Sequence, residues 1–354
     1  MSDSIVITGC GWVTPFAAGG IEDVLRAAGL ATESINSQGY HPIADDLLAG
    51  FSEVTPECRN DPGAWLAAVA FECVRRDASP AAGSDPPERI GMVLGNALAG
   101  QSGMIDFAND VREQSPRFVS PIRFPQTVGN FITGALSRAY DVRGPNSTVA
   151  AGLASGLFAL VEGCALLTAG KADLIFAGGT ERLSPALAMG LAEPDVVFSD
   201  GACLFALERK EHALARGATI FAKIISTADQ IPSEPRAHAP DSDRGSARAD
   251  APPKVSIRSV AGTREPGAIF IERCIGRCLG ALGAAAVAAA IGAARGLAVP
   301  IVDHADTSKI SDRRLGMKDP AATTTAVVTA QAGNEHQTLL TLEVPCAELR
   351  PAKH

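Results

Sequence analysis

The stretch TVAAGLASGLFALVEGCALLTAG, residues 148–170, decides the fold. It opens with β-branched residues that favour a short strand, and Gly152 then marks a tight turn. The following residues are almost all apolar and leave no polar face, so they predict a helix buried inside a domain. Such a turn suits a nucleophile, because the unpaired N–H groups of the first helical turn stabilise a thiolate or an oxyanion. Here the turn carries none.

The longer run RGPNSTVAAGLASGLFAL, residues 143–160, resembles the nucleophile turn of the β-ketoacyl synthases of the thiolase superfamily. That turn usually reads close to RGPN-T-V-x-x-A-C-A-S-G. In this register the family's cysteine falls on Leu153, whereas the small residues around it are retained as Ala154, Ser155 and Gly156. The resemblance therefore implies the architecture of a synthase without its nucleophile.

Further segments extend the resemblance from Ile5 to Leu342. The most specific are KADLIFAGGTE, residues 171–181, and LERKEHALARGA, residues 207–218. The resemblance implies an α/β thiolase fold, in which two similar βαβαβαββ halves stack in five α-β-α-β-α layers. We expect residues 1–228 to form the N-terminal half and residues 229–354 to form a shortened C-terminal half.

Composition narrows the class of protein. The chain has 354 residues, of which 46% are hydrophobic, so it can bury a large core. The net charge is −8 and no basic cluster with interleaved aromatic residues is present, which argues against a nucleic-acid partner. The eight cysteines lack CxxC spacing, which is typical of reduced thiols rather than of a disulfide framework or a metal site.

The only apolar run that resembles a membrane span is residues 279–294. It is rich in Ala and Gly and shorter than the roughly 20 strongly apolar residues that a span needs, so it predicts a second buried helix. The N-terminal residues lack the pattern of a signal peptide, and we expect the protein to be cytoplasmic. The GxG after the first strand lacks the third glycine and the acidic residue of a dinucleotide site.

An ordinary synthase also uses two histidines, which donate hydrogen bonds to the negative charge that develops on decarboxylation. The resemblance places Ala261 at the first histidine and Arg277 at the second. Neither side chain can do that work, so we predict no catalytic residue at the degenerate positions Leu153, Ala261 and Arg277. Arg277 could still bind an anion, although burying it requires a partner. His238 lies in a polar loop, where a lone histidine is usually solvated.

The segment SPIRFPQTVGN, residues 120–130, resembles one that lies by the dimer interface of the synthases and lines the neighbour's acyl pocket. Taken alone, the segment could equally be an ordinary loop. The resemblance implies a pocket or tunnel formed by Phe124, Gln126, Thr127, Asn130 and Ser155. It implies a dimer interface at Asn146, Ser147, Thr148 and Val149.

The leading hypothesis is a non-catalytic homologue similar to the chain length factors of type II polyketide, fatty-acid or aryl polyene pathways. The resemblance implies a heterodimer with an active ketosynthase and an encounter with acyl carrier protein, whose phosphopantetheine thioesters the partner would use. The chain itself is expected to need no cofactor and no metal. One alternative is an acyltransferase or thioesterase that uses Ser155, or Cys274 and Cys278, as its nucleophile. Another is a homodimeric acyl-binding scaffold.

Overall fold

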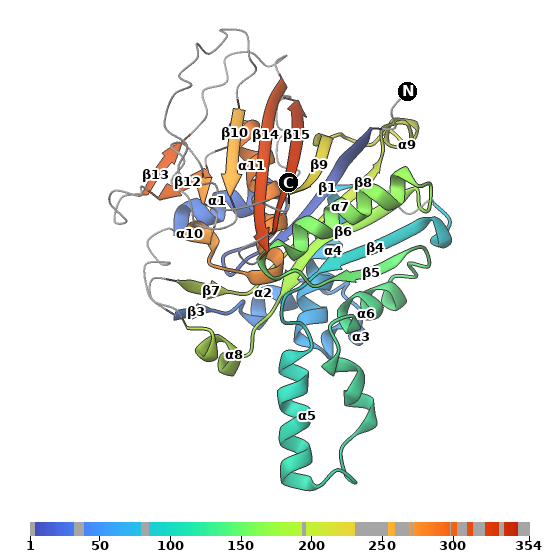
Figure 1. Ribbon diagram of the computed structural model, residues 1–354, viewed down its shortest axis with the longest axis vertical. Coiled ribbons are helices and arrows are strands. Elements are labelled where there is room, and N and C mark those ends of the chain that lie inside the picture. Colours follow the sequence, from blue (N-terminus) through green and yellow to red (C-terminus); the bar gives the residue numbers. More distant parts are fainter. Residues whose placement is uncertain are drawn as a thin grey trace.

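The computed structural model describes residues 4–31, 39–78, 85–192, 196–230, 254–258, 269–270, 272–297, 299–302, 310–313, 323–332 and 336–345. Its strands are β1 (Ile5–Val13), β2 (Ala18–Gly19), β3 (Gly39–His41), β4 (Ile90–Gly95), β5 (Asn146–Val149), β6 (Leu174–Glu181), β7 (Val197–Ser199), β8 (Gly201–Arg209), β9 (Ala222–Gln230), β10 (Lys254–Arg258), β11 (Ile269–Phe270), β12 (Val299–Val302), β13 (Ile310–Arg313), β14 (Thr323–Ala332) and β15 (His336–Pro345). Figure 1 shows their arrangement.

The helices alternate with these strands along the chain. They are α1 (Ile21–Ala31), α2 (Asp45–Ala49), α3 (Pro56–Arg59), α4 (Pro62–Asp77), α5 (Gln101–Gln114), α6 (Phe131–Ala139), α7 (Ser155–Thr168), α8 (Pro185–Gly190), α9 (Lys210–Ala215), α10 (Glu272–Ile275) and α11 (Leu282–Ala294). Single 3-10 turns are η2 (Pro87–Arg89), η3 (Pro121–Thr127), η4 (Gly152–Ala154) and η5 (Leu279–Ala281).

The strand order repeats, which confirms the predicted duplication. In the large sheet, five strands form a first set in the order β5-β4-β6-β8-β1. Five strands that come later in the chain form a second set in the order β11-β10-β14-β15-β9. In each set the first two pairings are parallel and the last two are antiparallel. The two sets meet where β1 pairs with β9 at only two positions. The exact boundary at residues 228 and 229 stays a prediction.

The buried helices α7 and α11 lie between the two sets of strands. Helix α7 packs on β4 and β6, α11 packs on β10 and β14, and the two helices contact each other. Their backbones come close because the contact consists of small residues: a Cβ added to Gly156 would lie 2.9 Å from the carbonyl oxygen of Gly280. All thirteen residues of α11 are buried. Hydrophobic burial of this layer therefore joins the two halves.

One part of the burial prediction was wrong. Helix α11 has no polar face and is fully buried, as expected, but α7 leaves Ala165 and Thr168 exposed. A helix that is apolar all round carries no signal of which side faces water, so its sequence could not reveal this partly open side.

Helix α4 covers the opposite face of the first set of strands, where it packs on β1, β6 and β8. The described residues thus supply four of the five expected layers. In the repeat, the counterpart of α4 would follow β9, and residues 231–253 lie outside the described residues. Among the helices that the structure describes, none combines the length and the apolar character needed to cross a bilayer.

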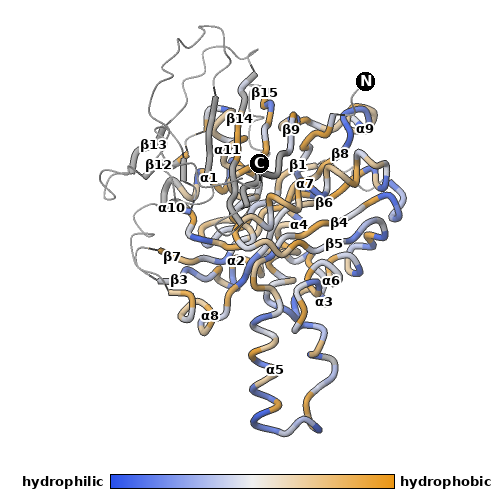
Figure 2. Tube along the Cα trace, viewed as in Figure 1, coloured by the Kyte–Doolittle hydropathy of each residue, from blue (hydrophilic) through white to orange (hydrophobic). Residues whose placement is uncertain are grey.

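Residues 100–130 form an arm that extends away from the rest of the molecule (Figure 1). The arm consists of α5 and η3, which pack on each other. Asp110 pairs with Arg123 at 2.8 Å, and the rings of Phe107 and Phe124 lie 5.8 Å apart. Hydrophobic and hydrophilic residues alternate along it (Figure 2). None of the residues of α5 is buried, so the arm contributes little to the core of its own chain.

Candidate functional site

The predicted turn forms as expected between β5 and α7. Gly152 has a φ of +58°, a left-handed conformation that favours glycine, and Leu153 follows it in η4. The Leu153 side chain is partly buried and packs against a small hydrophobic cluster of Leu183, Ala188, Phe198 and Leu279. The position that would hold a nucleophile therefore holds hydrocarbon packed against hydrocarbon.

Ser155 lies buried beneath this turn. Its Oγ accepts a hydrogen bond from the N–H of Ala151 at 2.8 Å and lies 2.7 Å from the carbonyl oxygen of Gly152 and 3.0 Å from that of Asn96. A hydroxyl has one hydrogen, so the two carbonyls share it. These contacts fasten the turn to the end of β4 and engage the hydroxyl with the backbone, which is the role of a structural serine.

Sequence reasoning missed Glu181, the central polar residue beside the turn. Its side chain is 1% exposed and accepts hydrogen bonds from the N–H groups of Ala97 at 2.6 Å, Leu98 at 3.1 Å and Gly280 at 3.3 Å. Burial raises the pKa of Glu181 to about 7, although the three bonds favour its charged form. A single carboxylate thus ties β6 to the base of the arm and to the second half. The signal was available, because an acidic residue that ends a fully buried strand requires partners.

Arg277 has the partner that its burial requires. Its Nε donates to Glu272 at 3.1 Å, and its guanidinium lies 5.8 Å from the ring centroid of Phe198. The backbone of Arg277 forms a parallel bridge with Phe198, so β7 holds it in place. An anion would have to compete with Glu272 for this guanidinium, which makes the predicted anion site at Arg277 unfavourable.

A second buried acid, Asp200, holds the chain beside the turn and was also missed. Its carboxylate accepts from the Tyr40 hydroxyl at 2.7 Å and from the N–H groups of Ile43 and Leu183, each at 3.0 Å. These bonds fix β3 and β7 next to the cluster that contains Phe198. Asp200 therefore ties together the segments that surround the cluster around Leu153.

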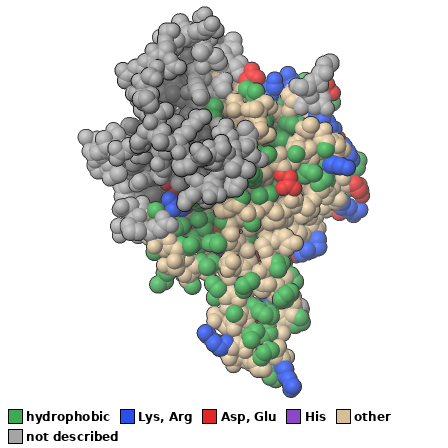
Figure 3. All heavy atoms as spheres, viewed as in Figure 1, with side chains coloured by type: hydrophobic (Ala, Val, Ile, Leu, Met, Phe, Trp, Pro, Cys, Tyr) green, Lys and Arg blue, Asp and Glu red, His purple; other side chains and the backbone are tan. Residues whose placement is uncertain are grey.

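The predicted pocket residues lie on the arm or at its end. Phe124 is 57% exposed, Gln126 is half-buried, Thr127 is buried and Asn130 is exposed. Further apolar side chains of the same region are exposed, and Figure 3 shows them gathered along the arm. They are Met104 at 49%, Phe118 at 75% and Val128 at 43%.

The predicted interface residues Asn146, Ser147, Thr148 and Val149 make up β5, which ends its row of strands. Within the described residues β5 pairs only with β4, so its other edge is open to a further strand. Thr148 contacts Thr133 at 2.6 Å, and Asn146 bonds to Ser137, so two of these side chains are held by α6. Whether these residues form a dimer interface stays a prediction.

Several predicted positions lie outside the described residues, among them Ala261 and His238. The side chain of Cys274 also lies outside the description. Within the ranges that the structure covers, no group of His, Cys, Asp and Glu side chains is arranged to hold a metal ion.

The described thiols are expected to resist alkylation in the native protein. Burial raises the pKa of Cys278 well above its ordinary value, and raises that of Cys73 and Cys164 to about 12. We predict that iodoacetamide leaves these three cysteines unmodified for as long as the protein stays folded. Leu153→Cys, at a partly exposed position before α7, is expected to be alkylated at least tenfold faster.

Peptide mapping by mass spectrometry measures both rates. The wild-type chain unfolded in urea is the control, in which all eight cysteines should react. Fast native alkylation of Cys278 would contradict the prediction and would revive an acyl-enzyme on that residue.

Comparison with known proteins identifies relatives of the whole arrangement. The family model for the β-ketoacyl synthase N-terminal domain matches residues 27–210. The chain is 30% identical over 209 residues to 3-oxoacyl-(acyl-carrier-protein) synthase 2 of Rhizobium meliloti, which covers 51% of the chain and 48% of the relative. It is 33% identical over 160 residues to the enzyme of the same name from Vibrio cholerae, which covers 39% of each. The chain thus spans about half or less of the length of these curated relatives.

Solved structures extend the similarity of the fold to nearly the full chain. The ishigamide ketosynthase/chain length factor superposes with a TM-score of 0.73 at 15% identity, over 97% of this chain and 100% of that one. A ketosynthase structure in which a type II polyketide acyl-carrier protein is bound gives a TM-score of 0.72 at 16% identity, over 97% and 99%. At these identities the likeness shows a shared fold, the thiolase fold of the ketosynthases.

Proposed function

This chain belongs to the β-ketoacyl synthase family, and on that premise we propose that it is a non-catalytic subunit similar to a chain length factor. It pairs with an active ketosynthase in the cytoplasm and serves a type II polyketide, fatty-acid or aryl polyene pathway. The partner forms the carbon–carbon bond on thioesters of acyl carrier protein. This chain supplies interface and part of the wall of the acyl tunnel.

The observation that carries the proposal is the turn at Leu153. The turn is intact, yet its key position packs into an apolar cluster, and the neighbouring Ser155 bonds to backbone groups. Arg277, where the family has its second histidine, pairs with Glu272. A decarboxylating site needs a nucleophile and hydrogen-bond donors aimed at developing charge. Leu153 offers neither, the Ser155 hydroxyl is engaged with the backbone, and the Arg277 guanidinium is paired with a carboxylate.

The arm and strand β5 support the proposal that the chain pairs with another subunit. Exposed apolar side chains such as Phe118 and Phe124 gather along the arm (Figure 3), and large contiguous apolar patches are rare on a monomer surface. The open edge of β5 can accept a strand from another subunit. Together they offer a partner both backbone hydrogen bonds and an apolar surface, which are the components of a stable subunit interface.

The alternative of an acyl-enzyme on Ser155 or Cys278 has less support. The Ser155 hydroxyl is engaged with the backbone, and burial keeps the Cys278 thiol protonated. A homodimeric acyl-binding scaffold would use the same arm and the same strand edge, so only a measurement of the partner separates it from the leading proposal.

Reconstitution with a ketosynthase encoded beside this chain tests the proposal. We expect the purified chain alone to elongate no acyl-carrier-protein thioester, and to form an equimolar complex with the ketosynthase on co-expression. Omitting the chain should change the length or yield of the product, measured by mass spectrometry of the carrier-bound acyl groups. Elongation by the chain alone would refute the proposal, and a stable homodimer that ignores the ketosynthase would favour the scaffold.

A further inference from the structure

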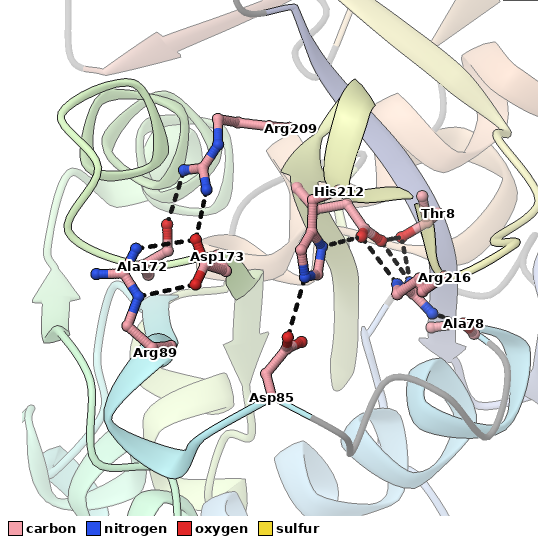
Figure 4. Close-up of polar contacts among 10 residues, drawn as sticks. Thr8, Ala78, Asp85, Arg89, Ala172, Asp173, Arg209, His212 and Arg216 are labelled. Atoms are coloured by element: carbon pink, nitrogen blue, oxygen red, sulfur yellow. Dashed lines mark hydrogen bonds and ion pairs between the residues drawn. The ribbon is translucent and has the colours of Figure 1, made fainter. Parts of the chain in front are cut away.

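A polar network far from the turn joins helix α9 to three other parts of the chain (Figure 4). At its centre is Glu208, at the end of β8, whose side chain is fully buried. Its carboxylate accepts from the hydroxyl of Thr8 on β1 and from the guanidinium of Arg216, whose Nε lies 2.8 Å away. Arg216 also donates to the carbonyl oxygen of Ala78, at the end of α4. The Glu208 carboxylate thus has hydrogen-bond partners within the fold.

His212 connects this buried centre to a separate segment of the chain. Its Nδ1 lies 2.7 Å from Glu208 Oε2, and its Nε2 lies 3.0 Å from Oδ1 of Asp85, which precedes η2 and β4. Figure 4 shows the imidazole of His212 directed toward Asp85, and its other ring nitrogen contacts Glu208. Both carboxylates accept when ionised, so only a doubly protonated imidazolium can donate to both. A neutral imidazole has one N–H and loses one of the two bonds.

We propose that His212 is a pH-dependent clamp that fastens the chain at Asp85 to helix α9 when its imidazole is protonated and releases it when neutral. The bond that is lost is the one to Asp85. Glu208 already accepts from Arg216 and Thr8, and its bond to Nδ1 joins residues only four apart in the chain, at the junction of β8 and α9. Asp85 is the end that the structure leaves poorly held, because its Oδ2 is buried without a hydrogen-bond partner among the described residues.

The surroundings of His212 shift its pKa in both directions. Burial lowers the pKa of His212, but the bonds to Asp85 and Glu208 raise it, and the net pKa lies above 6.5. Arg216 lies behind Glu208, and Arg89 lies beyond Asp85. The Arg89 guanidinium is bound to Asp173 at 2.8 Å, together with Arg209. On α9 itself, Lys210 and Glu211 carry opposite charges and directly precede His212 in sequence.

The sign of the pH dependence follows from the linkage between protonation and folding. A histidine whose pKa is raised by folding contributes stability that is fully present below the pKa of the unfolded chain, about 6.5. That contribution is lost as the pH rises through the higher pKa of the folded protein. The clamp is therefore closed in mildly acidic solution and opens under alkaline conditions.

The segment that the clamp holds leads into the first set of strands. The carbonyl oxygen of Pro87 accepts from Arg143, and that of Ile90 accepts from Gly144, immediately before β5. Release of Asp85 is expected to loosen the contact between the residues that lead into β4 and those that lead into β5. This inference does not depend on the proposed function, because it concerns only contacts within the chain.

Hydrogen exchange of the amides of Glu88, Arg89 and Ile90, followed by mass spectrometry at pH 6.0 and pH 8.5, tests the clamp. After correction for the intrinsic exchange rate, we expect wild-type protection to fall by about threefold to tenfold at the higher pH, as befits one partly exposed charge-assisted bond. His212→Gln should lose that pH dependence. His41→Gln, which changes a histidine on β3, is the control and should behave as wild type.

A titration of the wild-type His212 imidazole by NMR keeps the test independent of any variant. An imidazole that titrates above 6.5 supports the clamp. An imidazole that titrates at or below 6.5, or an unchanged pH dependence in His212→Gln, would overturn it. If His212→Gln fails to fold, Asp85→Asn is the substitute, because it removes only the charge at the outer end and should show the same loss.

Discussion

Glu181→Ala is expected to destabilise the protein by about 3 to 5 kcal/mol, among the largest losses from a single substitution outside the packed core. The substitution leaves the buried N–H groups of Ala97, Leu98 and Gly280 without an acceptor. Each orphaned donor costs roughly 1 to 3 kcal/mol, with incomplete additivity because the three share one partner. The free energy of unfolding in urea at constant pH measures the loss.

Two matched variants show whether the loss of stability comes from the missing hydrogen-bond acceptor. Glu181→Gln keeps an acceptor oxygen where Oε2 receives its three bonds, so we expect it to lose clearly less than Glu181→Ala. Glu211→Ala removes an exposed carboxylate from α9 and should change stability by less than about 0.5 kcal/mol. A Glu181→Ala protein that unfolds within 1 kcal/mol of wild type would show that water or a shifted backbone satisfies these groups.

Met104→Asp combined with Phe124→Asp is expected to abolish assembly with the ketosynthase. Both side chains lie exposed on the arm, at 49% and 57%, so charging them costs the isolated chain little beyond the ring contact between Phe124 and Phe107. In a complex that covers the arm, each carboxylate would be buried without a partner. We expect affinity to fall by at least about 100-fold, which corresponds to about 2.7 kcal/mol.

Sedimentation of the purified chain with and without the ketosynthase measures this loss. Leu214→Asp is the control, because Leu214 is 60% exposed on α9, outside the arm. The control should assemble as wild type does, and thermal unfolding should show all three chains equally stable. Normal assembly of the charged arm would mean that the partner binds another surface, and the role proposed for the arm would be abandoned.

Much of the fold could be predicted from the sequence because its signals are local. The turn at Gly152, the buried helix α11 and strand β6 each follow from a run of apolar residues next to glycine. The sequence predicts that β6 ends at Gly178 and Gly179, whereas the strand continues to Glu181. The repeated strand order itself came from the resemblance, because spacing alone does not specify which strands pair.

The polar chemistry around the turn could not be predicted as readily. Glu181 and Asp200 each bind groups that are distant in sequence, and no local pattern marks such partners. The residues that resemblance singled out were those with known roles in synthases. The residues that hold the degenerate turn together were found only through burial and hydrogen bonding.

The close crossing of α7 and α11 depends on small residues and not on the side chains at the reactive positions of the family. Among the described residues, the two sets of strands share only the pairs Val6 with Lys223 and Ile7 with Ala222. Cohesion therefore rests on a helix pair that has no room for larger side chains at Gly156 or Gly283. A subunit that performs no catalysis tolerates substitutions at its reactive positions. A larger side chain at either glycine would still destabilise the contact between the two halves. In such a protein, relaxed selection should therefore allow substitutions in the active site long before it allows them at the contact between α7 and α11.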